Sequence, residues 1–219
     1  ATHAGARIWV PHTEQDLFAR VDHHWRAREI DNNYNNRQDR FSLLEPVHVD
    51  GTLLDYETRR FGAYDFLVVP TPGHTTGSIT LLAEINATLV AFTGDLIYAP
   101  GKVWSMAATQ WSYNGAEGVA AGIASLLDLK DRQPGLLLPS HGEPMDDPPP
   151  AIDLLVQRFW ELLQLRGQNP NLFRLRDNPY QPVTPHLLWH RASMANTYVL
   201  LSESKKALLF DFGYDFITG

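Results

Sequence analysis

The sequence contains no cysteine among its 219 residues. This absence excludes disulfides, thiolate zinc sites, iron–sulfur clusters and cysteine nucleophiles, and it fits a reducing compartment, so we expect a cytoplasmic chain. No apolar run approaches the roughly 18 residues that a membrane helix requires, so we expect no membrane partner. The chain also contains neither the GxSxG segment of serine hydrolases nor the GxGxxG segment of dinucleotide-binding proteins.

Positive charge is scarce as well, because 18 lysines and arginines stand against 25 aspartates and glutamates, a net charge of -7. Nucleic-acid binders normally carry a basic face, so we expect no nucleic-acid partner. The hydrophobic share of 44% is ordinary for a protein that buries a core. Nine histidines remain, so a transition-metal site would have to use imidazole and carboxylate ligands.

The hydrophobic pattern alternates between strand-like and helix-like segments, which predicts an α/β or α+β layered fold. Strands are expected at residues 6–11, 47–49, 52–57, 64–70, 78–84, 88–93 and 135–139, with a C-terminal hairpin at 197–201 and 207–212. Helices are expected at 13–28, with Thr13 as N-cap, at 115–129, and at 148–165, where Ile152, Leu155, Phe159 and Leu163 share one face.

Three short segments carry the chemistry, and each follows an apolar strand. They read TPGHTTGS, FTGDL and LPSHG, and they place His74, Asp95 and His141 at three strand ends. Imidazole with carboxylate suits zinc, iron or manganese. Taken singly, a strand-end histidine is more often a structural residue, and Asp95 could cap the segment that follows it. The combination and its order favour a shared metal site.

These motifs resemble those of the metallo-β-lactamase fold superfamily, in particular its glyoxalase II and lactamase-like hydrolase branch. TPGHTTGS is similar to the superfamily's third-motif histidine, FTGD to its bridging aspartate and PSHG to its final histidine, over roughly residues 6–165. The resemblance implies a four-layer αβ/βα sandwich with a metal site, usually dinuclear. It implies that His74 binds one metal and His141 the other, while Asp95 bridges them and positions the catalytic water.

The superfamily's first motif, HxHxDH, does not occur in the sequence. The Asp22-His23-His24 run has a different spacing and falls on an expected helix, whereas His3 could be a remnant of such a motif. Three ligands shared between two ions leave each with two at most, and stable zinc sites have three or four. We therefore expect weak metal binding and little activity for this chain alone.

The C-terminal segment from Met194 to Phe216 resembles the first hairpin of the same superfamily, placed last. The resulting organisation is a metallo-β-lactamase-like domain over 1–167 that is incomplete or permuted at its N-terminus, a linker or extended arm over 168–187, and the hairpin over 188–219. The hairpin either completes the first domain or begins another. We hypothesise that it pairs with the sheet that holds His74.

The function expected for the intact protein is metal-dependent hydrolysis of a small-molecule substrate by a metal-activated water, with one or two zinc ions, or iron or manganese, as cofactor. Two alternatives stay open: an iron-dependent oxygenase on the same scaffold, and a degenerate, non-catalytic binding module. The segment Val103 to Tyr113 carries two tryptophans and could wall a substrate pocket or serve only in packing.

Overall fold

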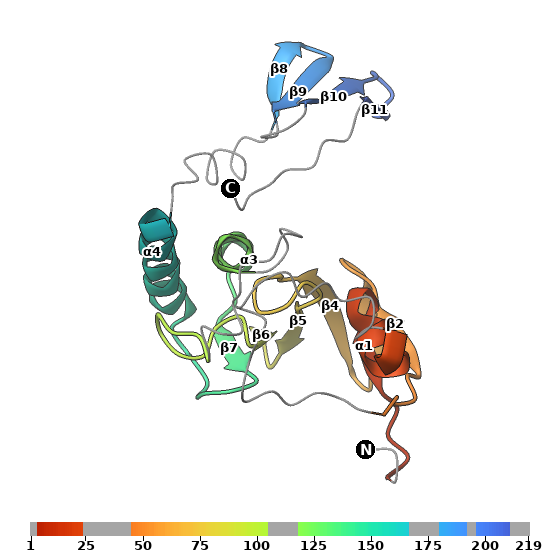
Figure 1. Ribbon diagram of the computed structural model, residues 1–219, viewed down its shortest axis with the longest axis vertical. Coiled ribbons are helices and arrows are strands. Elements are labelled where there is room, and N and C mark those ends of the chain that lie inside the picture. The colour runs from red at the N-terminus through yellow and green to blue at the C-terminus, as the bar shows by residue number, and fades with distance from the viewer. Residues whose placement is uncertain (1–3, 24–44, 105–117, 167–179, 192–195, 211–219) are drawn as a thin grey trace.

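The computed structural model describes residues 4–23, 45–104, 118–166, 180–191 and 196–210 (Figure 1). At its centre lies a five-stranded sheet in the order β3-β4-β5-β6-β7. Its strands are β3 (Thr58–Phe61), β4 (Tyr64–Pro70), β5 (Ile79–Ile85), β6 (Thr88–Gly94) and β7 (Leu136–Pro139). Neighbouring strands from β3 to β6 are antiparallel, and β6 and β7 are parallel. The strands β4, β6 and β7 therefore run in one direction and end at the same edge of the sheet.

Two helices form the main core with this sheet. The helix α3 (Val119–Asp131) connects β6 to β7, and α4 (Pro148–Arg166) packs against it. All four residues expected on the inner face of α4 are buried, which confirms the 3.6-residue pattern read from the sequence. The core that they share with the sheet includes Val69, Leu82, Ala91, Leu137, Ile123, Leu126, Ile152, Leu155, Phe159 and Leu163.

The strand β3 is not anticipated by the sequence pattern. Its residues include two adjacent arginines, so it lacks the apolar alternation that marks a strand. In the structure the guanidinium of Arg59 lies 4.0 Å from the centre of the Trp9 ring, a distance at which a cation is attracted to the face of an aromatic ring. The strand expected at 52–57 is correspondingly shorter, because only Gly51–Leu53 forms β2.

An N-terminal unit consists of β1 (Trp9–Pro11), paired in parallel with β2, and the helix α1 (Gln15–Ala19). Gly51 is required there, because a Cβ atom at this position would lie 2.2 Å from the Trp9 ring. Aromatic rings connect this unit to the central sheet, since the Trp9 and Phe61 centroids are 5.6 Å apart and those of Phe61 and Phe66 are 6.0 Å apart.

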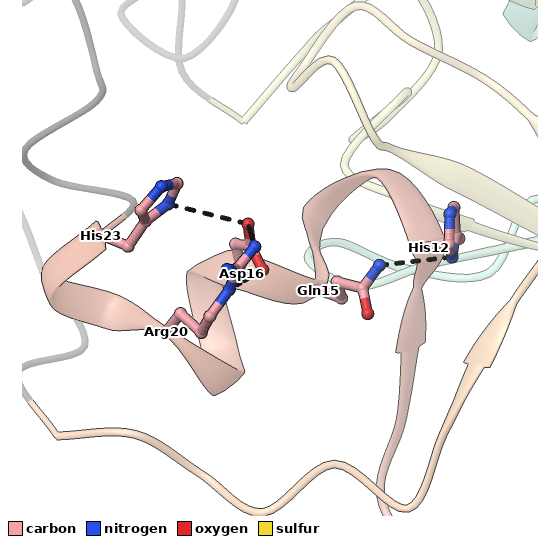
Figure 2. Close-up of polar contacts among 5 residues, drawn as sticks. All are labelled: His12, Gln15, Asp16, Arg20 and His23. Carbon is pink, nitrogen blue, oxygen red and sulfur yellow. Dashed lines mark hydrogen bonds and ion pairs between the residues drawn. The ribbon is translucent and has the colours of Figure 1, made fainter.

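The helix expected over 13–28 is wrong in its extent. Thr13 belongs to a short 3-10 helix, and no side chain caps α1. The chain leaves helical geometry at Arg20, whose guanidinium turns back and donates hydrogen bonds of 2.7 and 2.6 Å to the Asp16 carboxylate (Figure 2). These bonds raise the pKa of Arg20 above its ordinary value. Residues 21–23 are helical again, and 24–28 lie outside the described ranges.

The C-terminal strands form a separate four-stranded antiparallel sheet, in the order β11-β10-β9-β8. They are β8 (Gln181–Thr184), β9 (Leu187–Arg191), β10 (Asn196–Leu201) and β11 (Ala207–Phe210). The expected hairpin of β10 and β11 is confirmed, but the hypothesis that it pairs with the sheet of His74 is wrong, because β10 pairs with β9 instead. Figure 1 shows this sheet apart from the central one.

The strand β8 and the first residue of β9 fall within 168–187, where the sequence favours a linker or extended arm. Pro182 is compatible with a strand because it lies on the edge strand β8, where its missing N–H costs little. The structure as a whole is a mixed α/β fold, as predicted. No helix within the described ranges is long and apolar enough to cross a membrane.

Candidate metal centre

The three side chains singled out in the sequence meet at one edge of the central sheet. His74 follows β4, Asp95 follows β6 and His141 follows β7. His74 Nε2 lies 3.4 Å from Asp95 Oδ2, and His141 Nδ1 lies 2.7 Å from Asp95 Oδ1. One carboxylate therefore lies between two imidazoles, with a different oxygen facing each ring.

The loop after β4 is held against the start of α3. The Gly73 carbonyl accepts a 2.8 Å hydrogen bond from the Gly118 N–H, and Ser125 Oγ donates to the Pro72 carbonyl at 2.7 Å. Gly73 has a φ of 150°, and a Cβ atom there would lie 2.8 Å from the Gly122 Cα. Glycine at both positions allows the two backbones to approach closely, which fixes the height of the loop above the sheet.

Backbone and hydroxyl groups of the TPGHTTGS motif close the same loop. The Thr71 N–H donates to the Ser78 carbonyl at 2.8 Å, and the hydroxyls of Thr75 and Ser78 are 2.8 Å apart. Gly77 lets the backbone pass close to another segment, as its place in the motif predicts. That segment is the Glu14 side chain, because a Cβ atom at Gly77 would lie 2.3 Å from it.

Asp95 is presented by a sharp turn at the end of β6. Gly94 has a φ of 57°, and its carbonyl accepts a 2.8 Å hydrogen bond from the Ser140 N–H at the end of β7. This bond ties together the two strand ends that carry Asp95 and His141. In the described part of the chain no backbone N–H donates to the Asp95 carboxylate, so this carboxylate does not act as a cap there.

His141 is held by residues that the sequence did not single out for this role. Gly142 has a φ of 99°, and a Cβ atom there would lie only 2.1 Å from the Tyr98 carbonyl oxygen. The Trp104 ring stacks on the imidazole, with centroids 4.6 Å apart and planes 12° from parallel. Trp104 lies in the segment expected to wall a pocket, whose residues 105–113 are outside the described ranges.

The donor set fits a metal ion in its chemistry, because imidazole and carboxylate are ordinary zinc ligands. The 3.4 Å between His74 Nε2 and Asp95 Oδ2 also suits two ligands of one tetrahedral ion, with metal–ligand bonds of about 2.1 Å. The 2.7 Å contact of His141 is instead a direct hydrogen bond. An ionised Asp95 accepts that bond, which leaves the lone pair on His141 Nε2.

The described residues do not supply a complete set of ligands. Within them, no group of three or more histidine, aspartate or glutamate side chains is arranged so that it could hold a metal ion. His23 is a described residue and belongs to no such group; its Nδ1 atom lies 3.8 Å from Asp16 Oδ2 (Figure 2). His3 and His24 lie outside the described ranges. The roles of His74, Asp95 and His141 as metal ligands stay predictions.

No protein-family model matches the chain, and no curated protein sequence is significantly similar to it. Solved structures do resemble it. A metallo-β-lactamase family protein from Thermus thermophilus is 18% identical with a TM-score of 0.51, over 73% of this chain and 55% of that protein.

Two further structures show lower similarity. A class B3 di-zinc metallo-β-lactamase from an Alaskan soil metagenome is 18% identical with a TM-score of 0.48, over 75% of this chain and 64% of that one. An archaeal metallo-β-lactamase superfamily protein from Sulfolobus tokodaii is 18% identical with a TM-score of 0.46, over 70% and 58%. The chain thus spans less than two thirds of the length of each of these proteins. The Thermus thermophilus structure, with its TM-score of 0.51, confirms the predicted resemblance at the level of the fold: the chain has the metallo-β-lactamase fold.

Proposed function

We propose that the intact protein is a metal-dependent hydrolase that acts on a small-molecule substrate in the cytoplasm. His74, Asp95 and His141 would hold zinc, together with ligands beyond the described residues. The observation that carries the proposal is the Asp95 carboxylate lying between two imidazoles, at 3.4 and 2.7 Å, where three strands end. The chemistry that bound zinc supplies is a water of lowered pKa and a polarised substrate oxygen.

The residues themselves have separable tasks. Asp95 has a side chain only 14% exposed, so its negative charge is poorly solvated and attracts cations strongly. It accepts the Nδ1 proton of His141 and thereby sets which nitrogen of that ring is free to bind an ion. His74 is held on the other side of the carboxylate by the loop that is docked on α3. No side-chain nucleophile is required, which agrees with the absence of cysteine and of a GxSxG segment.

Zinc titration of the full chain, followed by calorimetry, tests the proposal. We expect one weak binding event, because the described ligand set is incomplete. Asp95→Asn, His74→Ala and His141→Ala should each weaken binding by at least about tenfold. His186→Ala, at an exposed position between β8 and β9, is the control and should leave binding unchanged. Equal affinity in all four variants would refute the site.

Hydrolysis of chromogenic acyl and phosphoryl esters in the presence of zinc or manganese then tests the reaction: we expect only slow, metal-dependent hydrolysis by this chain and none by Asp95→Asn. Oxygen consumption by an iron-loaded protein would support the oxygenase alternative instead. Tight zinc at a stoichiometry of one would show that the chain holds a complete site by itself, contrary to our expectation.

A further inference from the structure

The segment from Tyr98 to Trp104, which we name the 98–104 loop, is a closed turn between β6 and α3. The Tyr98 N–H donates to the Lys102 carbonyl at 2.8 Å, and the Lys102 N–H donates to the Ala99 carbonyl at 2.8 Å. Gly101 adopts a φ of 68°, which lets the chain reverse within these few residues. The loop is therefore closed by hydrogen bonds between its own backbone groups.

The 98–104 loop is tied to α4 through both backbone polar groups of Gly101. Arg158 Nη1 donates to the Gly101 carbonyl at 2.7 Å, and the Gly101 N–H donates to the Ala151 carbonyl at 3.2 Å. A Cβ atom at Gly101 would lie 2.6 Å from the Leu154 side chain, so the contact is close as well as hydrogen-bonded. Because α4 belongs to the main core, the loop has a fixed position relative to the sheet.

This fixed loop contacts the His141 turn in two places. The Tyr98 carbonyl lies against Gly142, and the Trp104 ring stacks on the His141 ring. The His141 side chain is 48% exposed, so the core does little to restrain it. The hydrogen bond to Asp95 restrains Nδ1, and the stack restrains the plane of the ring. Together the hydrogen bond and the stack fix the orientation of the imidazole ring, and with it the direction in which the Nε2 lone pair points.

We propose that Trp104 is a positioning residue for His141: it holds the imidazole plane so that Nδ1 stays on Asp95 and Nε2 keeps a fixed direction toward a bound ion. This inference rests on the proposed metal-binding role of His141 and extends it to a residue that binds no metal. The Tyr98 ring, 5.4 Å from that of Trp104, supports the stack from within the same loop.

Zinc affinity of the full chain measures the effect. Trp104→Ala should weaken binding by about tenfold, the size usual when a group that orients a ligand is removed. Trp104→Phe retains an aromatic face and should recover most of the loss. Tyr64→Ala removes another exposed aromatic side chain, far along the sheet in β4, and should bind zinc as the parent does. Equal binding by Trp104→Ala and the parent would overturn the proposal.

A double-mutant cycle separates positioning from a general structural effect. If Trp104 acts through His141, Trp104→Ala should cause no further loss in a chain that already carries His141→Ala. The same weakening in both backgrounds would contradict the proposal.

Nuclear magnetic resonance of the His141 ring, recorded without metal, keeps this test independent of the proposed function. The indole ring current should shift the His141 ring protons upfield, and Trp104→Ala should abolish that shift and loosen the hydrogen bond to Asp95. If the parent chain binds no zinc but Trp104→Ala still abolishes the shift, the metal site is refuted and the positioning of His141 by Trp104 is supported. Unchanged His141 resonances in Trp104→Ala would refute the positioning itself.

Discussion

Two glycines, Gly73 and Gly142, shape the candidate site because neither position has room for a side chain. Gly73 and Gly142 flank the two histidines, and each lies where a Cβ atom would meet backbone atoms, at 2.8 and 2.1 Å. Backbone cannot move aside as a flexible side chain can. At both positions glycine therefore determines where the neighbouring imidazole is placed.

Gly142→Ala tests this at the level of one residue. The substitution forces an L side chain to a φ of 99° and drives its Cβ into the Tyr98 carbonyl, so we expect a loss of about 2–4 kcal/mol in the free energy of unfolding. Urea unfolding followed by circular dichroism measures it. Gly62→Ala is the matched control, because Gly62 has a φ of 60° with nothing within 4 Å of its Cβ position. Gly62→Ala should lower the free energy of unfolding by about 1 kcal/mol. Equal losses for Gly62→Ala and Gly142→Ala would show that backbone strain, and not the contact with Tyr98, accounts for the effect.

Among the elements, α3 links the core to the loop that carries His74. Ser125 on α3 is 4% exposed and donates to the Pro72 carbonyl at 2.7 Å. Ser125→Ala should leave that carbonyl without its partner and lower the free energy of unfolding by about 1–2 kcal/mol. Ser140→Ala removes an exposed hydroxyl and should change stability by less than about 0.5 kcal/mol. Chemical unfolding of both variants provides the comparison, and equal effects would argue against the anchor.

The helix α4 contributes buried side chains to the main core. Ile152 is completely buried in the main core, so Ile152→Ala should cost about 2–5 kcal/mol in the free energy of unfolding. Gln164→Ala, on the exposed face of the same helix, should be nearly neutral. Thermal and urea unfolding distinguish the two. A cost below about 1 kcal/mol for Ile152→Ala would mean that α4 does not pack as described.

The elements also show what local sequence can and cannot predict. The hairpin of β5 and β6 is predicted because Asn86 allows its turn, where φ is 52°. The end of α1 at Arg20, where φ is -133° and ψ is 59°, has no glycine or proline to announce it in the sequence. The strand β3 is missed because its sequence, TRRF, has no apolar alternation, while its pairing with β4 and the contact of Arg59 with Trp9 are formed only in the folded chain. Tertiary contacts of this kind leave no periodic signal.

The residues of the candidate site also differ in how well the sequence predicts them. His74, Asp95 and His141 are found because each is a ligand-type residue within four positions of the end of an apolar strand, and the common direction of β4, β6 and β7 brings these ends together. Trp104 is anticipated only as part of an aromatic segment. Its stack on His141 requires a loop pinned to α4, and no spacing rule contains that information.

At the scale of the whole molecule, the described structure consists of a central sheet with its helices and a C-terminal sheet that shares no strand pairing with it. Every strand pairing of β8 to β11 is with another member of that sheet, and none of their residues belongs to the main core. The site, its loops and both helices that brace them all precede residue 167. Stability and metal binding of the first part should therefore not depend on the second.

A chain truncated after Arg166 tests this independence. We expect its thermal unfolding midpoint to lie within about 4 °C of that of the full chain, a difference of about 1 kcal/mol for a domain of this size. Its zinc affinity should also be unchanged, because His74, Asp95 and His141 and the Trp104 ring that stacks on His141 all precede residue 167. Calorimetric unfolding and zinc titration of both chains measure the two quantities.

A control chain that lacks only residues 211–219 keeps all four strands and checks for effects of shortening itself. Loss of cooperative unfolding in the first truncation but not in the control would mean that the C-terminal sheet completes the fold through contacts other than strand pairing.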